Sequence, residues 1–342
     1  MSTQSATNDA ADFFVLPEES QQQFRLLELP PELLEILTSA DAKPIHFKSS
    51  PDSASPITLC TPTQTYAARQ VNTSNTVYIT QPHSTTTAGI LATAKSDFTY
   101  ELTPNPPTPD TVTRHLRAIL PLYTSTGTLP LHATKAKKPD LLADLPFSTL
   151  DCERGWKRLA CFELDHDEAK CCFVPSGEAK LQAWNSIIQR AREYGVDLTA
   201  DAFDESLLLM DADAEVPVEL SRAILRSVAV DGDDASRLDA SETVRQTGSW
   251  RLEATRGPMK VVEFVEEWKD LLPERWREMA KLEDLKGEIE VVEEGREVRL
   301  AAGVGGGSRG AVGEKAGAVA EAKSLGAKRK WHEKFRASMK GA

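Results

Sequence analysis

The sequence predicts an α+β protein, in which a β-rich N-terminal part of a composite barrel is followed by tandem winged-helix domains. Three observations predict this class. β-Branched and aromatic residues are dense at 57–80. The proline-rich run NPPTP at 105–109 marks a domain boundary. Beyond it, amphipathic helical stripes are twice followed by a hairpin pattern, which is the order of a winged helix.

Residues 57–80 predict three short strands. Pro62 interrupts the first strand, because proline has no N–H to give to a ladder, and residues 66–71 resume the pattern. The Asn/Ser cluster at 72–75 predicts a turn, and 77–79 form the third strand. Three strands of this length are too few to close a barrel, so their edges must be covered. We therefore expect another polypeptide to complete this part.

The elements around these strands follow from local signals. Residues 1–23 are polar and predict a flexible N-terminus. Residues 24–29 and 45–47 predict strands, and 98–102 predict a closing strand. A Pro-Pro pair after the first of these strands opens a short helix. The apolar residues expected on the buried face of that helix are Leu33, Leu34 and Leu37.

Residues 106–180 predict a first winged helix. A helix starting at Pro109 has apolar residues spaced i, i+4, i+7, i+8. Ser148, with Asp151 three residues on, caps a third helix. An acidic turn at 165–168 joins two apolar segments into a hairpin. The apolar face of the first helix comprises Val112, Leu116, Ile119 and Leu120.

Residues 181–302 predict a further winged-helix region that ends in a hairpin at 288–301, with Gly295 at its turn. Residues 303–342 form a Gly-rich linker and a basic tail. The predicted organisation is therefore 1–23, 24–105, 106–180, 181–302 and 303–342. Helices of the further region are expected at 184–191, 201–210, 218–228, 241–256, 261–272 and 276–285.

Charge is distributed unevenly along the chain. The formal net charge is −12 over 342 residues. From residue 301 onward there are nine Lys/Arg against three Glu, so the tail carries +6 and the remainder −18. Since affinity for phosphate comes from Lys and Arg, we expect any binding to DNA to be weak and confined to a local site near the C-terminus.

Cysteine usage and hydropathy indicate an intracellular, soluble protein. The five cysteines are odd in number and irregularly spaced, which favours reduced thiols over a disulfide scaffold. The N-terminus lacks a basic-then-apolar signal pattern. No apolar run approaches the ~20 residues of a membrane helix, so no membrane contact is expected.

Four sequence runs, in this order, carry a resemblance to a known family. They are LLELPPELLEIL at 26–37, LCTPTQTYAARQVNTSNTVYI at 59–79, LPFSTLDCERGWKRLACFEL at 145–164 and EFVEEWKDLLPERWREMAKLEDLKG at 263–287. Together they resemble the family of the sister chromatid cohesion protein Dcc, a subunit of the Ctf-type alternative replication factor C clamp loader. None of the runs is a catalytic signature.

The resemblance implies a nuclear, non-enzymatic adaptor subunit without a cofactor. In that family the N-terminal region forms a composite β-barrel with the two other Ctf-type subunits and meets polymerase epsilon. The winged helices of the family contact DNA and the polymerase. The complex, with its replication factor C small subunits, loads or unloads PCNA and supports sister chromatid cohesion. This sequence departs from the longer members of the family, because the Gly-rich linker and basic tail stand where a further winged helix would follow.

The partner-binding candidates lie in the stretch that matches the family's strand-turn-strand. We expect this hairpin to pack against a partner's strands and complete the barrel. The alternative is that Arg69 is an exposed strand residue and the Asn/Ser cluster only a turn. The candidates are Tyr66, Arg69, Val71, Ser74, Asn75, Thr76 and Tyr78.

Candidate DNA contacts lie in the tail, where aromatic rings could stack on bases. A nuclear localisation signal and a merely disordered basic end are the alternatives. The helix at 148–161 occupies the recognition-helix position and is basic, but nearby acidic residues favour protein docking. The tail candidates are Lys328, Arg329, Lys330, Trp331, Lys334, Phe335 and Arg336.

Metal and catalytic sites are not predicted. Cys152, Cys161, His166, Cys171 and Cys172 lack a C-x-x-C pair, so we interpret them as core thiols and a turn histidine rather than a zinc site. The sequence has no Walker loop and no H-E-x-x-H motif. Two rival functions remain: a winged-helix regulator that reads DNA sequence, and a scaffold subunit of another nuclear complex.

Overall fold

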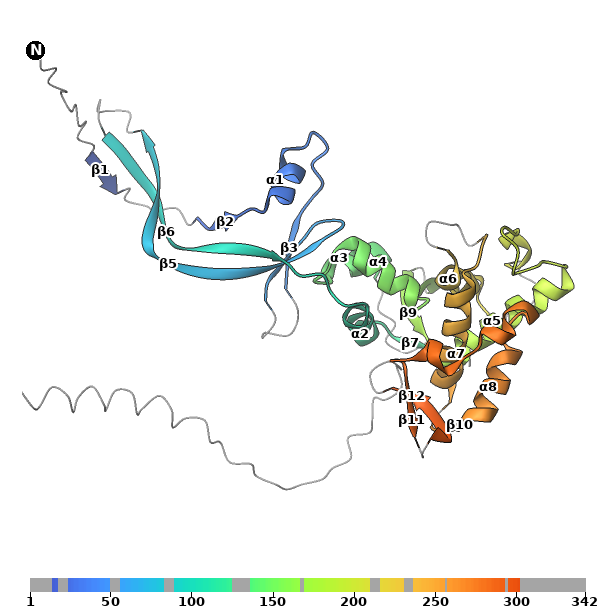
Figure 1. The fold of residues 1–342 in the computed structure, drawn as a ribbon. Coiled ribbons are helices and arrows are strands. Elements are labelled where there is room, and N and C mark those ends of the chain that lie inside the picture. The colour runs from blue at the N-terminus through green and yellow to red at the C-terminus, as the bar shows by residue number, and fades with distance from the viewer. Residues whose placement is uncertain are drawn as a thin grey trace, which may run out of the picture. The chain divides into compact units, whose positions relative to one another are not determined.

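The computed structural model describes residues 14–17, 24–49, 56–82, 89–124, 136–166, 169–209, 216–230, 236–255, 257–292 and 295–301. They form a mixed α+β fold, as predicted, in which a six-stranded sheet precedes two three-stranded sheets that lie among helices (Figure 1). No closed barrel occurs within these ranges.

The six-stranded sheet is built around two long antiparallel strands, β5 (Thr65–Pro82) and β6 (Gly89–Pro104). On the far side of β6, two short strands pair with it in parallel. On the far side of β5, two short antiparallel strands follow in succession. These shorter strands are β1 (Phe14–Pro17), β2 (Leu26–Glu28), β3 (His46–Lys48) and β4 (Thr58–Cys60).

The turn predicted at 72–75 is wrong. β5 continues through these residues, and its pairing with β6 resumes at Val77 opposite Ser96 after Asn72 opposite Phe98. More residues lie on β5 than on β6 between these two pairs, so the polar cluster forms a β-bulge instead of reversing the chain. Because β6 is long enough to pair on both sides of the bulge, the backbone of β5 keeps its partner.

Two other N-terminal segments differ from expectation. Residues 1–13 and 18–23 lie outside the described ranges, but within the same segment β1 pairs with β6. Helix α1 (Pro31–Thr38) begins at the predicted proline and buries Leu33 completely. Leu34 and Leu37, which we expected on the buried face, are 51% and 40% exposed. The helix packs on the core through Leu33 and Ile36, so Leu34 and Leu37 lie off the side that faces the core.

The first helical region has the predicted order of three helices and a hairpin. Ser148 caps its third helix by accepting a hydrogen bond from the backbone N–H of Asp151 at 3.1 Å. Ile119 is 41% exposed, although its spacing predicted burial. The elements are α2 (Pro109–Ile119), β7 (Leu122–Tyr123), α3 (Lys138–Asp144), α4 (Thr149–Arg158), β8 (Phe162–His166) and β9 (Ala169–Pro175).

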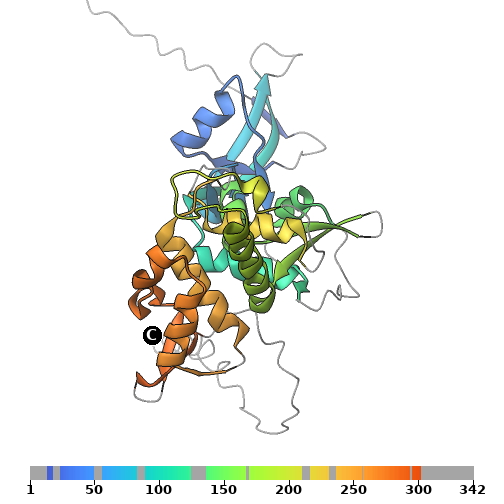
Figure 2. The ribbon, with the colours of Figure 1, turned by 90° about the vertical axis from the view of Figure 1, so that its right-hand side faces the viewer.

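The following region contains four of the six predicted helices, and α5 packs beside α6 and α7 (Figure 2). It ends in the predicted hairpin, with Gly295 at φ 90°. The elements are α5 (Gly177–Glu193), α6 (Val218–Val228), α7 (Ala240–Ala254), β10 (Met259–Lys260), α8 (Val261–Asp270), β11 (Ile289–Val292) and β12 (Glu297–Leu300).

The helices predicted at 201–210 and 276–285 are wrong. Residues 201–209, the described part of the first, contain a 3₁₀ turn at Glu205–Leu207 and no α-helix, because the Asp204 carboxylate accepts the backbone N–H of Ser206 and closes a local turn. In place of the second stand two 3₁₀ segments, Glu274–Met279 and Leu282–Leu285. They are separated because Lys281 is extended, at φ −125° and ψ 138°.

The two three-stranded sheets share one strand order but differ in strand direction, because β7 runs parallel to β9 whereas β10 runs antiparallel to β12. In each, a helix leads into a short strand, further helical segments follow, and a hairpin closes the unit. The short strand lies beside the last strand of the hairpin, in the orders β7-β9-β8 and β10-β12-β11. The tandem winged-helix interpretation therefore stays a prediction, which the shared order of elements allows and the parallel pairing of β7 does not match.

Candidate partner-binding surface

One edge of β5 is uncovered over most of its length. β4 pairs with β5 only at residues 65–67, and Ala68 adds one backbone hydrogen bond, to Ile57, at 2.8 Å. Over 69–82, β5 pairs with β6 on one side, and no other strand of the described chain pairs with it on the other (Figure 1). A free strand edge of this kind presents backbone donors and acceptors that another strand can pair with.

The base of the sheet is anchored to the first helical region. The backbone N–H of Ser148 donates to the hydroxyl of Thr65 at 2.8 Å, and that of Leu150 donates to the carbonyl of Pro62 at 2.9 Å. Lys48 donates to nearby backbone carbonyls of that region as well. The base is therefore held by the first helical region, whereas the open part of β5 pairs with β6 on one side and with no other described strand.

The core of the β-rich part is small. Among the described residues it consists of four buried side chains, whereas the two cores of the helical regions contain thirteen and thirty. Its members are Leu33, Leu59, Tyr66 and Leu102. Since stability comes mainly from buried apolar surface, this part lacks the interior expected of an independent domain.

A row of apolar side chains crosses the sheet and ends uncovered at its edge. Tyr66 on β5 pairs with Leu59 on β4, and Leu59 pairs with Phe47 on β3, so the three side chains share one face. Tyr66 and Leu59 are 1% and 0% exposed, but Phe47 on the outermost strand is 60% exposed. The row of apolar side chains thus reaches the outermost strand of the sheet, where nothing in the described chain covers Phe47.

Exposed apolar residues concentrate in this part of the molecule. Among the described residues, thirteen large hydrophobic side chains are exposed, and seven of them lie between residues 24 and 78. Monomeric proteins rarely leave such surface in contact with water. The seven are Phe24, Leu34, Leu37, Phe47, Ile57, Val77 and Tyr78.

The structure separates the predicted partner-binding residues into two groups. Tyr66 belongs to the core, where its hydroxyl donates to the side-chain oxygen of Gln64 and burial raises the pKa of the phenol. Tyr66 therefore stabilises the sheet as a core residue and is not itself available for contact with a partner. The others lie beyond the point where β4 ends, on the open part of β5: Arg69, Val71, Ser74, Asn75, Thr76 and Tyr78.

Of the open-edge residues, Tyr78 has the largest exposed apolar side chain, at 56%. Arg69 is highly exposed and pairs across the ribbon with Glu101 on β6, at 2.9 Å. Thr76 donates to Asp97 on β6, also at 2.9 Å. These polar contacts stabilise the ribbon on its paired side and leave the other edge open. Sequence reasoning missed Phe47 as a surface residue, because its register beside Leu59 is not visible without the sheet.

The sequence matches the family model of sister chromatid cohesion protein Dcc1 over residues 24–301. This match spans the β-rich part and both three-stranded sheets. The chain belongs to the Dcc1 family. Membership gives it a role in sister chromatid cohesion and a place in a cohesion-related complex. Comparison with individually curated proteins finds no match.

In this Dcc1-family chain, the cations at the recognition-helix position are partly engaged within the molecule. Arg158 lies 3.5 Å from Glu288, and the ammonium of Lys157 donates to the carbonyl of Ala229 at 3.0 Å. Arg154 is exposed. Two of the three cations of α4 therefore contribute to contacts with later elements, which agrees better with protein docking than with reading a DNA groove.

All five cysteines of the Dcc1-family chain are buried and free. Burial raises the pKa of Cys152 and of Cys172 to about 12, and it also raises the pKa values of Cys60 and Cys161. The side chain of His166 is outside the described residues. Within the described ranges no three His, Cys, Asp or Glu side chains gather as metal ligands would.

The predicted tail contacts, from Lys328 to Arg336, fall outside the described residues. None of the helices within the described ranges is both long enough and apolar enough to cross a membrane.

Proposed function

We propose that this chain is a non-catalytic adaptor subunit of a nuclear alternative clamp loader. Its β-rich part forms a composite barrel with the two other Ctf-type subunits, and through it the complex meets polymerase epsilon. The complex, with its replication factor C small subunits, loads or unloads PCNA on replicating DNA. In that arrangement ATP hydrolysis belongs to other chains.

The single observation that carries this proposal is the unfinished state of the six-stranded sheet. Its core row ends at the exposed Phe47, and the edge of β5 over residues 69–82 has no partner strand in the described chain. A partner that adds a strand would gain backbone hydrogen bonds along the edge and bury Val77 and Tyr78. Family membership supports a complex as the setting for such a partner.

The rival function, a winged-helix regulator that reads DNA sequence, is less well supported. Such a protein needs a basic recognition face. Outside the tail the chain carries −18, and two cations of α4 are held by Glu288 and by Ala229. We therefore assign the winged helices to docking and confine weak DNA contact to the tail.

Co-expression of the full chain with the two Ctf-type subunits tests the proposal. Val77→Asp combined with Tyr78→Asp places charges on the open edge of β5, where both side chains are exposed in the free chain. Val262→Asp is the matched control, because Val262 is 70% exposed at the start of α8, far along the chain from this edge.

We expect the double variant to lose about tenfold or more of the co-purified partner, since buried uncompensated charge weakens association by at least about 1.4 kcal/mol. The control should recover as much partner as the unchanged chain. Equal recovery by the double variant and the control would refute the assignment of the edge.

A further inference from the structure

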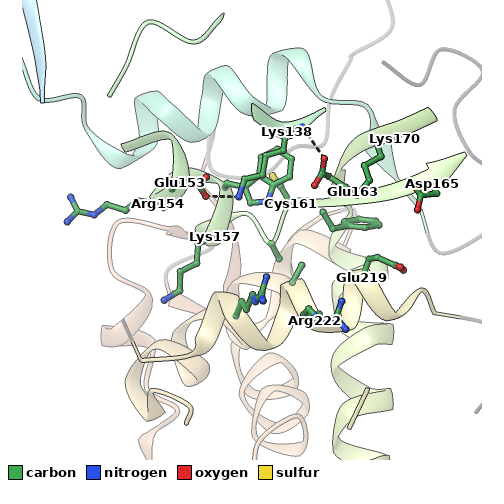
Figure 3. Close-up of a pocket in the computed structure, with 15 residues that line it drawn as sticks. Lys138, Glu153, Arg154, Lys157, Cys161, Glu163, Asp165, Lys170, Glu219 and Arg222 are labelled. Atoms are coloured by element: carbon green, nitrogen blue, oxygen red, sulfur yellow. Dashed lines mark hydrogen bonds and ion pairs between the residues drawn. The ribbon is translucent and has the colours of Figure 1, made fainter. Parts of the chain in front are cut away.

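A pocket of about 620 Å³ lies between α4, the β8–β9 hairpin and α6 (Figure 3). Trp156 and Phe162 line its interior, and both are nearly buried. The pocket is formed where the first helical region meets α6, away in sequence from the open edge of β5. The inference therefore rests on the docking role proposed above for the winged helices and not on the open edge of β5.

The lining of this pocket is rich in cations. Six Lys and Arg side chains line it against four carboxylates, within a body that carries −18 overall. Lys138 is engaged: its ammonium lies 2.6 Å from Glu153 and 5.2 Å from the centre of the Trp156 ring. The six cations are Lys138, Arg154, Lys157, Lys170, Arg222 and Arg226.

Three arginine side chains that line the pocket have no polar partner among the described residues. In the part of the chain that the structure describes, the side chains of Arg154, Arg222 and Arg226 have no hydrogen bond or ion pair. Arg222 and Arg226 lie four residues apart on α6, so they share one face of that helix. Arg154 reaches the same pocket from α4. Cations gathered without partners in an acidic protein indicate a ligand of negative charge.

Charges of both signs are distributed along the pocket. Figure 3 shows Arg154 with Glu153 toward one end, whereas Lys170 and Arg222 lie with Asp165 and Glu219 toward the other. A ligand that is negative throughout would meet carboxylates at both ends. A short ligand whose carboxylates are separated by neutral groups can meet the cations and avoid the carboxylates of the lining.

We propose that this pocket binds a short acidic peptide segment of a partner protein. Carboxylate side chains of the peptide pair with the guanidinium groups of Arg154, Arg222 and Arg226, which are suited to bidentate hydrogen bonding. The apolar wall at Trp156 and Phe162 excludes water from one side of these pairs and strengthens them.

A peptide fits these observations better than nucleic acid does. A duplex presents phosphates continuously, so it would bring charge against the four carboxylates of the same lining. The body's net charge of −18 repels a long polyanion over a Debye length of about 8–10 Å, whereas a short peptide experiences mainly the local cations. The concave pocket can also admit a few peptide side chains more readily than it can admit a rod-shaped duplex.

Fluorescence anisotropy with the full chain tests the proposal. The probe is a fluorescein-labelled peptide in which Glu alternates with Ser, and the reference peptide carries Gln in place of Glu. The main variant is Arg222→Glu with Arg226→Glu, and a second variant is Arg154→Glu at an exposed position. Arg192→Glu on α5 is the matched control, because Arg192 is exposed and does not line the pocket.

We expect the Glu peptide to bind and the Gln peptide not to. The double variant should weaken binding by about tenfold or more, and Arg154→Glu by about threefold or more, since each loses a charge-assisted pair and gains a repulsion. Arg192→Glu should stay within about twofold, because it changes only the screened long-range field. Circular dichroism melting curves verify that each variant is folded, and Arg154→Glu remains informative if the double variant is not.

Three results would overturn the proposal. The first is absence of binding by the Glu peptide. The second is equal binding by the pocket variants and Arg192→Glu, which would place the peptide elsewhere, such as on the basic tail. The third is displacement of the peptide by a random-sequence DNA duplex together with loss of duplex affinity in the pocket variants, which would make the pocket a nucleic-acid site.

Discussion

Gly248 shows how a single residue fixes the packing of two helices. It lies within α7, and a Cβ atom added there would stand 2.7 Å from Cε2 of Trp268 on α8. The Trp268 ring is fully buried and donates to the carbonyl of Val244 at 2.9 Å. Glycine has a low propensity for the interior of a helix. It is present at this position because the backbone of α7 approaches the Trp268 ring too closely for a side chain to fit.

We expect Gly248→Ala to destabilise the protein. The added methyl overpacks a ring that cannot move, which costs about 1–3 kcal/mol and outweighs the gain in helix propensity. Chemical denaturation measures the change. Gly257→Ala is the control, because a Cβ atom added at Gly257 would meet nothing within 4 Å, and it should leave stability nearly unchanged. A Gly248→Ala protein as stable as the control would contradict this packing account.

The buried thiols give a second prediction at the scale of residues. With a pKa of about 12, Cys152 and Cys172 remain protonated at mildly alkaline pH, and thiols in this state react slowly. We expect the native chain to resist alkylation by iodoacetamide and the denatured chain to take up five labels, as counted by mass spectrometry. Rapid labelling of the native chain would show that these thiols are more accessible than their burial indicates.

At the scale of elements, contacts between helices include a buried ion pair. The Lys180 ammonium on α5 lies 2.7 Å from the Glu253 carboxylate on α7, and the side chains are 2% and 9% exposed. Arg117 on α2 lies 3.7 Å from the same carboxylate. Through its two cations, the Glu253 carboxylate on α7 therefore connects α7 to α5 and to α2 of the first helical region.

Lys180→Met should destabilise the protein by about 3 kcal/mol, because it removes the ammonium group 2.7 Å from the buried Glu253 carboxylate. Lys138→Met removes a pair that is partly in water, at 26% and 45% exposure, and should cost about 1 kcal/mol or less. Thermal melting of both variants distinguishes the two environments. A smaller loss in Lys180→Met than in Lys138→Met would be inconsistent with the burial of the first pair.

Elements with strong local signals could be predicted from the sequence. The helix predicted to start at Pro109 does so, Ser148 caps the helix that the sequence assigned to it, and Gly295 turns the last hairpin. The bulge at 72–75 could not be predicted, because an Asn/Ser cluster favours a turn unless a distant strand supplies its hydrogen bonds. The 3₁₀ segments were missed for a similar reason: the apolar spacing of 276–285 resembles a helix, but the extended Lys281 interrupts it.

At the scale of the whole molecule, the main result is that the hydrophobic cores differ greatly in size. Among the described residues the helical regions have cores of thirteen and thirty buried side chains, whereas the six-stranded sheet has a core of four and a long open edge. The sequence predicted an incomplete sheet from its strand count alone. It could not show where the sheet stays open, because the exposure of Phe47 and the free edge of β5 depend on registers between distant strands.

Hydrogen–deuterium exchange at the amides of β5 tests the central claim most directly. The measurement compares residues 69–82 in the free chain and in the complex with the two Ctf-type subunits. If a partner strand completes the sheet, amides on the open edge should exchange quickly in the free chain and be strongly protected in the complex, while residues 65–67, already paired with β4, change little. Unchanged exchange over residues 69–82 in an intact complex would contradict the account.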